Sequence, residues 1–134
     1  MVENVLVKEI LTESMIKAGA ELTRILDQMN WPLTASLWFY FAEENQWKLL
    51  ISSPSVATEG PKRAYQRVQE ALGNFPQDMP KIDLEDVAVT DDSHPLISLM
   101  KVAIPTGGGI SGIRFSRNVI NGQVIEDAYI YRLQ

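Results

Sequence analysis

The chain has 134 residues and a mass of 15.1 kDa, the size of one ordinary domain, and we expect residues 1–134 to form a single domain. With 46% apolar and 22% charged residues, it has the composition of a globular protein and not of a disordered one. The lack of cysteine and the presence of one histidine exclude disulfides, thiolate nucleophiles, Cys-ligated zinc, iron–sulfur clusters and multi-histidine metal sites. We therefore expect no cofactor and no specifically bound metal.

The formal charge of −5 is concentrated in one segment. Residues 77–92 contain six acidic side chains and one basic one, Lys81, whereas acidic and basic residues balance in the rest of the chain. This distribution gives no bulk attraction to phosphate backbones, so we expect no strong nucleic-acid binding. The sequence also lacks an apolar run of about 18 residues and a basic N-terminal region followed by an apolar stretch. We therefore expect a cytoplasmic protein that does not span a membrane.

The first part of the chain predicts a long helix followed by a hairpin. Apolar residues recur every three or four positions over 3–29, which is the spacing of an amphipathic helix, and the helix ends before Pro32. Two strands rich in aromatic and branched residues follow at 35–42 and 46–53, with a polar turn between them. Both faces of the first strand are apolar, so we expect both to be covered.

A second helix and two further strands are predicted next. The helix begins at Pro61, a residue favoured at the first helical position, and extends to Gly73. Residues 84–90 predict a strand. Residues 96–104 fit either a helix that begins at Pro95 or a strand between two turn sequences, and we predict a strand.

The C-terminal hairpin has the clearest pattern in the sequence. Asn121-Gly122 is the preferred pair for a type I′ turn, and a two-residue loop at this place fixes the register of the two strands. Four pairs then share one face, which we expect to be the core side: Ile113 with Ile130, Phe115 with Ala128, Arg117 with Glu126 and Val119 with Val124. The opposite face carries polar and aromatic side chains, namely Arg114, Ser116, Asp127, Tyr129 and Tyr131.

This polar and aromatic face is the candidate binding patch of the sequence. Tyrosine and arginine are enriched at recognition surfaces because they combine contact area with directed hydrogen bonds. The alternative is that the five residues form ordinary cross-strand pairs. Both interpretations place the face on the solvent side of the sheet.

Three glycines, Gly107, Gly109 and Gly112, have the G-x-G-x-x-G spacing found where backbone amides approach a pyrophosphate. A dinucleotide site also needs a helix directly after the glycines, with its N-terminus facing the phosphate. Residues 113–120 instead predict a strand. We therefore interpret the glycines as a turn.

Two groups of polar residues suggest an enzyme. His94 lies beside Asp91 and Asp92, which could form an acid–base or metal cluster, although Asp and Ser are also typical of turns. The segment Glu43–Lys48 can be compared with the E-x-K strand that helps restriction-type nucleases to hold magnesium. Here Gln46 stands in place of the carboxylate, which argues against that chemistry.

A small basic ridge and a set of surplus aromatic residues complete the candidates. The ridge lies at the start of the second helix, where amides are unpaired, and could bind an anion weakly or form a solvated helix face; it comprises Lys62, Arg63 and Arg67. The aromatic set is larger than two helices are expected to cover and comprises Trp38, Tyr40 and Trp47. We predict that it anchors an interface in a homodimer or larger assembly.

Together these patterns predict an α+β fold, with a largely antiparallel sheet of about five or six strands and two main helices, in the order helix, hairpin, helix, strands, hairpin. Because no convergent catalytic set is present, we expect a small non-catalytic binding or regulatory module that acts through protein–protein contacts, with a second copy or another protein as its partner. The alternative is a small hydrolase or nuclease-like enzyme that uses acidic residues near His94 or in the Glu43–Lys48 hairpin.

Overall fold

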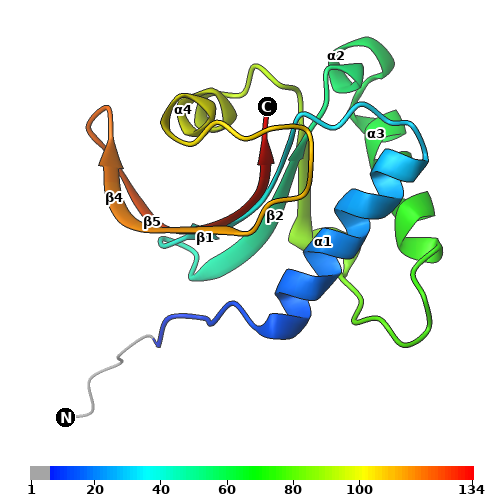
Figure 1. The fold of residues 1–134 in the computed structure, drawn as a ribbon, viewed down its shortest axis with the longest axis horizontal. Helices are drawn as coiled ribbons and strands as arrows, with labels where there is room; N and C mark the ends of the chain where they lie inside the picture. The colour runs from blue at the N-terminus through cyan, green and yellow to red at the C-terminus, as the bar shows by residue number, and fades with distance from the viewer. Residues whose placement is uncertain (1–6) are drawn as a thin grey trace.

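The computed structural model describes residues 7–134 and shows an α+β fold (Figure 1). Its elements are α1 (Glu13–Gln28), β1 (Ala35–Phe41), β2 (Gln46–Ser52), α2 (Ser55–Glu59), α3 (Pro61–Gly73), the short 3₁₀ turn η1 (Leu84–Asp86), β3 (Val87–Thr90), α4 (Pro95–Ala103), β4 (Ile113–Ile120) and β5 (Gln123–Leu133). The predicted order of helix, hairpin, helix, strands and hairpin is confirmed, although α4 adds a third main helix.

The five strands form one mixed sheet in the order β3-β2-β1-β5-β4. β1 pairs antiparallel with β2 and β5, and β5 pairs antiparallel with β4. The pairing of β2 with β3 is parallel, so the sheet is not purely antiparallel. The reason is topological: the chain leaves β2, crosses over through α2 and α3, and returns to the edge of the sheet in the same direction.

Helices cover both faces of the sheet, which explains why β1 is apolar on both sides. α1 and α3 pack on one face, around Leu22 of α1 and Trp38 of β1, and we call it the α1 face. α4 packs on the other, where Met100 meets Leu37 and Ile130, and we call it the α4 face. Figure 1 shows α4 within the concave side of the curved sheet and α1 on the opposite side.

The prediction of a strand at 96–104 is wrong, because these residues lie in α4. Pro95 occupies the first turn of the helix, and the His94 side chain caps it by accepting a hydrogen bond from the Leu96 amide at 3.2 Å. Ile97 and Met100, three positions apart, are fully buried against the sheet. Short apolar runs fit both periods, and here burial against one face of a sheet selects the helix.

The first helix is shorter than predicted. It begins at Glu13, and the Thr12 side chain caps it by accepting a hydrogen bond from the Met15 amide at 3.2 Å. Residues 7–12 precede it without helical structure, and the predicted helical positions 3–6 lie outside the described residues. The Thr12 cap therefore sets the start of the helix, although the helical spacing of apolar residues continues before it in the sequence.

The predicted register of the C-terminal hairpin is confirmed for the pairs on both faces, including Ile113 with Ile130 and Ser116 with Asp127. Asn121 and Gly122 both have positive φ, at 49° and 79°, as a type I′ turn requires. Arg117 is the exception on β4: its φ of 49° is left-handed, and it is not paired with Glu126 as predicted. The β4 strand is therefore locally distorted without a shift in register.

α1 approaches the sheet very closely at Gly19. A Cβ atom at this position would lie 2.5 Å from the Tyr131 hydroxyl and 2.6 Å from the Trp38 indole nitrogen. The same two side chains donate hydrogen bonds to α1, from Trp38 Nε1 to the Met15 carbonyl at 3.0 Å and from the Tyr131 hydroxyl to the Ile16 carbonyl. The position of α1 over the sheet is thus fixed by contacts that only glycine permits.

We expect Gly19→Ala to lower the free energy of unfolding by about 2 kcal/mol, because the added methyl group must displace two well-packed aromatic side chains. Gly73→Ala is the matched control: no atom lies within 4 Å of its Cβ position, and its effect should stay below about 1 kcal/mol. Chemical denaturation measures both. Equal stabilities would mean that α1 can shift away from the sheet without cost.

Candidate functional site

Residues 7–11 form an extended segment that precedes α1 and lies over the α1 face; we call it the N-terminal strap. Side chains of the β1–β2 hairpin hold its backbone. Asn45 Nδ2 donates to the Val7 carbonyl and Asn45 Oδ1 accepts from the Glu9 amide, both at 2.9 Å, while Trp47 Nε1 donates to the Glu9 carbonyl at 2.8 Å. Within residues 7–134, no backbone–backbone hydrogen bond joins the strap to a strand. Because all three contacts are made to backbone atoms of the strap, they do not depend on the identity of its side chains.

Asn45 is held in the orientation that binds the strap. It lies in the turn between β1 and β2 with a φ of 48°, a left-handed conformation that asparagine tolerates better than most residues. Its side-chain oxygen also accepts a hydrogen bond from the Tyr40 hydroxyl at 2.6 Å. The ring of Tyr40 packs on that of Trp47, with 5.3 Å between their centroids. The turn and the aromatic pair thus present a preoriented amide to a peptide backbone.

Lys8 connects the strap to the middle of the sheet. Its Nζ atom lies 2.8 Å from Asp127 Oδ2 on β5. The same ammonium group lies 4.8 Å from the ring centroid of Tyr40 and 5.8 Å from that of Trp47, distances at which aromatic faces attract a cation. The Lys8 ammonium group therefore occupies a small site formed by the Asp127 carboxylate and the rings of Tyr40 and Trp47.

Asp127 is the charged centre of this site, and its side chain is only 4% exposed. Arg114 binds it in bidentate geometry, with both nitrogen–oxygen distances at 2.6 Å, and Ser116 Oγ lies 2.7 Å from Oδ1. The Arg114 guanidinium carbon also lies 5.6 Å from the Trp47 ring centroid. One buried carboxylate is thus surrounded by the donors of Lys8, Arg114 and Ser116.

These donors control the ionisation of Asp127. Burial by itself would raise the pKa of the carboxyl group, but the hydrogen bonds from Arg114, Lys8 and Ser116 outweigh it and hold the pKa well below its usual range. The hydrogen bond to Asp127 correspondingly raises the pKa of the Arg114 guanidinium. The site therefore keeps a permanent negative charge beneath two cations at neutral pH.

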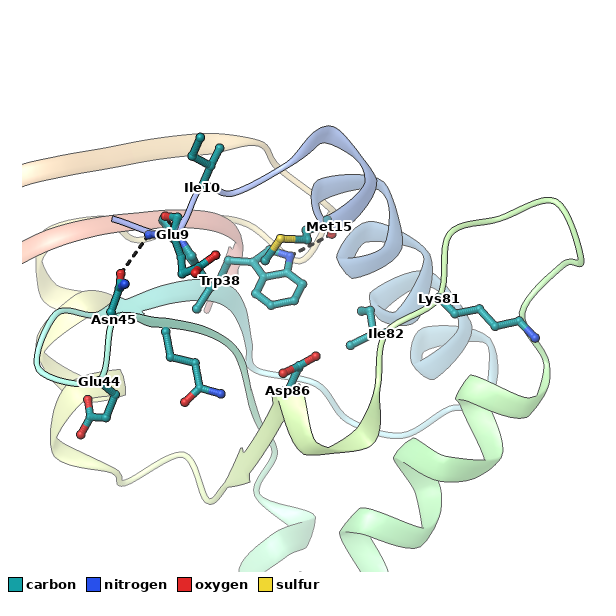
Figure 2. Close-up of a pocket in the computed structure, with 11 residues that line it drawn as sticks. Glu9, Ile10, Met15, Trp38, Glu44, Asn45, Lys81, Ile82 and Asp86 are labelled. Carbon is teal, nitrogen blue, oxygen red and sulfur yellow. Dashed lines mark hydrogen bonds between the residues drawn. The ribbon is translucent and has the colours of Figure 1, made fainter. Parts of the chain in front are cut away.

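A cavity of about 430 Å³ adjoins the strap (Figure 2). Trp38, Trp47 and Ile82 give it apolar walls, and Glu9 of the strap closes part of its rim. In Figure 2 the Trp38 indole lies between α1 and the carboxylate of Asp86. The strap is therefore one side of a depression that continues across the α1 face.

Acidic groups dominate the polar part of this cavity. Glu9, Glu44 and Asp86 line it, and Lys81, the one basic lining residue, points away from it in Figure 2. Burial, and then the neighbouring carboxylates of Asp83 and Glu85, raise the pKa of Asp86. The cavity and the Lys8 site both favour a cationic group over an anionic one.

The structure brings together part of the predicted binding patch. Arg114, Ser116 and Asp127 form one hydrogen-bonded group, and partly buried Tyr129 lies next to Tyr131, with 5.4 Å between ring centroids. Tyr131, however, is 1% exposed beneath α1, and burial raises the pKa of its hydroxyl group. The expectation that this face lies on the solvent side is wrong at Asp127 and Tyr131, because α1 and the strap cover them.

Sequence reasoning missed the strap and the two residues that define its contacts. Lys8 lies inside the helix predicted over 3–29, and Asn45 belongs to the predicted polar turn between the first two strands. The one local signal was Asn45 itself, a residue that favours left-handed turn positions. The contact between residues so distant in the sequence carries no signal in a single chain.

The aromatic residues predicted as interface anchors lie inside the protein. Trp38, Tyr40 and Trp47 are 2%, 7% and 4% exposed, because α1 and the strap cover the sheet above them. They therefore offer no exposed apolar surface to a partner. The homodimer stays a prediction.

The remaining polar candidates do not form one site. Lys62 and Arg63 are exposed on the first turns of α3, and Arg67 lies 3.6 Å from Glu59. His94 caps α4, and Asp91 accepts hydrogen bonds from the backbone and side chain of Ser93. The Glu43–Lys48 segment forms the β1–β2 turn and the start of β2. The three sets thus lie on different elements, and of them the Glu43–Lys48 segment contributes Asn45 and Trp47 to the strap site.

The glycine motif forms an anchored loop. Thr106 and Ser111 donate backbone hydrogen bonds to the carbonyls of Leu133 and Tyr131, both at 2.7 Å, and Arg132 Nε donates to the Gly109 carbonyl at 3.1 Å. The strand β4 follows the loop, as predicted. The geometry needed for a dinucleotide phosphate, a helix N-terminus after the glycines, is therefore lacking here.

Residues 7–134 contain neither a metal-binding cluster of side chains nor a membrane-spanning helix. No group of three or more His, Asp or Glu side chains in this range is arranged to hold a metal ion. None of the helices in the same range combines the length and apolarity needed to cross a bilayer.

Comparisons with known proteins give no family for this chain. No protein-family model matches it, and no curated protein or solved structure matches it at a significant level. Function must therefore be inferred from the side chains and contacts described above.

We expect Asn45→Gly to release the strap while leaving the hairpin intact, because glycine accepts the positive φ but offers no amide. Hydrogen exchange of the Glu9 amide should become faster by about 10-fold or more. Asn121→Gly is the control, since Asn121 has a φ of 49° in an exposed turn. Unchanged exchange in the Asn45 variant would show that the strap is held by other contacts.

We expect Asp127→Asn to lower the free energy of unfolding by about 2 kcal/mol at pH 7, because it weakens charge-assisted bonds from Arg114 and Lys8. The pKa of Asp127 is lower in the folded than in the unfolded chain, so this stability is present above about pH 4 and is lost as the pH falls further. The deficit of the variant, measured by denaturation, should therefore shrink below about pH 4.

Glu126→Gln is the control for this pH dependence, since Glu126 is the exposed neighbour of Asp127 on β5. Its effect should stay within about 0.5 kcal/mol. A deficit of Asp127→Asn that persists unchanged at pH 2 would contradict the assignment of ionised Asp127 as the stabilising form.

Proposed function

We propose that this protein is a non-catalytic binding module that acts through protein contacts, and that its binding surface is the α1 face around the N-terminal strap. The way in which the strap is held carries the proposal: Asn45 and Trp47 bind its backbone, and Asp127 binds its lysine. Backbone hydrogen bonds combined with a specific site for one side chain are a common means of recognising extended peptides.

The exposed groups around the strap also suit a protein partner. Val7 and Ile10 are 78% and 75% exposed, and the Arg114 side chain, 47% exposed, binds the same carboxylate as Lys8 of the strap. Protein interfaces combine apolar contact area with arginine and aromatic groups that make directed hydrogen bonds. A partner that lies along the strap would meet both kinds of group.

Asp91 and His94, two residues of the hydrolase or nuclease alternative, make local contacts in the turn before α4. Catalysis of that kind needs an acid or base with a free hydrogen-bonding position near a reacting atom. In residues 7–134, Asp91 Oδ1 accepts hydrogen bonds from Ser93, His94 Nδ1 caps α4, and no group of three or more His, Asp or Glu side chains is arranged to hold a metal ion. The binding module is therefore the better supported of the two functions.

A displayed library of random peptides, selected on the full-length protein, tests the proposal. Each selected peptide is measured again on Arg114→Ala and on Arg63→Ala, which remove the same side chain beside the strap and on the exposed surface of α3. We expect Arg114→Ala to weaken binding by about 10-fold or more and Arg63→Ala to leave it unchanged.

Two results would count against the proposal. Recovery of no binding peptide, or equal losses in both variants, would mean that the strap surface is not the binding site. Cleavage of the selected peptides by the protein, detected by mass spectrometry, would favour the hydrolase alternative.

A further inference from the structure

We infer that the N-terminal strap is an internal ligand of the binding surface, and that the partner is an extended peptide segment with a lysine or arginine in the place of Lys8. The inference rests on the proposed function and specifies both the class of partner and its competition with the strap.

The contacts to the strap backbone could be made by any extended peptide. Asn45 binds the Val7 carbonyl and the Glu9 amide, which are two residues apart, and Trp47 Nε1 binds the Glu9 carbonyl. All three bonds are made to backbone atoms, and the Tyr40 hydroxyl keeps the Asn45 amide in place. A partner chain with the same extended conformation would therefore find the same three hydrogen bonds.

The Lys8 site gives this surface its selectivity for a basic side chain. Arg114 and Ser116 occupy Asp127 Oδ1 and one side of Oδ2, and Lys8 Nζ takes the remaining position on Oδ2 at 2.8 Å. The Tyr40 and Trp47 rings, 4.8 and 5.8 Å from that nitrogen, attract a cation and offer nothing to an anion. The acidic lining of the adjoining cavity extends the same preference along the surface.

The strap is built to be displaced without loss of the core. Val7 and Ile10 are 78% and 75% exposed and the Lys8 side chain is 44% exposed, so among residues 7–11 only Leu11, next to the cap of α1, is buried in the core. Displacement of Val7, Lys8 and Glu9 therefore removes no buried side chain from the core, and an incoming peptide would cover Tyr40 and Trp47 in their place. As a tethered segment, the strap competes with a peptide in solution at a local concentration of about millimolar.

Two synthetic peptides test this inference. The first is acetyl-Val-Lys-Glu-Ile-Leu-Thr-amide, the sequence of residues 7–12, and the second has glutamine in place of lysine. Each is titrated into full-length wild type, Lys8→Gln and Lys17→Gln. Lys17 is exposed on α1, so its substitution removes the same charge without touching the strap contacts. Binding is followed by the indole N–H resonance of Trp47, which is assigned with Trp47→Phe.

We expect the lysine peptide to bind Lys8→Gln about 10-fold more tightly than the glutamine peptide does, as a charge-assisted hydrogen bond implies. The same peptide should bind wild type and Lys17→Gln about 10-fold more weakly than it binds Lys8→Gln, because their straps retain the competing lysine.

Each of the following results would overturn the inference. Equal affinity of both peptides for Lys8→Gln removes the preference for a basic side chain, and equal affinity of wild type and Lys8→Gln for the lysine peptide removes the competing strap. A wild-type dimer in sedimentation that dissociates on addition of the lysine peptide means that the strap binds a second copy instead. If neither peptide binds but the displayed library yields binders sensitive to Arg114→Ala, the inference fails and the proposed binding module stands. If neither peptide binds and the library yields no binder, the inference and the proposed function both fail.

Discussion

The close contact of α1 with the sheet at Gly19 is the constraint on which the α1 face depends. Without a side chain at this position, Trp38 and Tyr131 reach the carbonyl groups of Met15 and Ile16. One turn later, the hydroxyls of Thr23 and Ser36 meet at 2.7 Å in the core. Polar groups buried with partners fix one arrangement more strictly than apolar packing alone. Because α1 has one allowed position, the segment before it is directed across β1, β2 and β5.

Two ion pairs join β5 to the segments at either end of α1. Asp127 accepts from Lys8 before the helix, and Arg132, which is 3% exposed, binds Asp27 in its last turn with two contacts of 2.8 Å. In each pair one partner is buried and the other is partly exposed, which limits the desolvation that a fully buried pair would suffer. In the pair at the strap, the half-exposed partner is the cation, Lys8. An external cation can therefore compete with Lys8 for Asp127, whereas the cation of the other pair, Arg132, is buried.

The sequence predicted local structure well where a residue type sets the backbone directly. Asn121-Gly122 fixed the turn and register of the last hairpin, and Pro61 marked the first residue of α3. It fails where one pattern suits two structures: the apolar run of α4 also fits a strand, and the helical spacing of the N-terminal residues continues past the point at which Thr12 caps α1. Burial against the sheet decides the outcome for α4, and the hydrogen bond of the Thr12 cap decides it for α1.

The candidate site shows the same division between local and tertiary determinants. By itself, the sequence determined that Arg114, Ser116 and Asp127 share one face of a hairpin, because strand alternation and a two-residue turn leave no other arrangement. Only the tertiary structure decided that this face is covered, that Asp127 is buried there, and that Lys8 and Asn45 complete its surroundings. The physical reason is that these contacts join residues up to 119 positions apart, and their geometry follows from how α1 seats on the sheet.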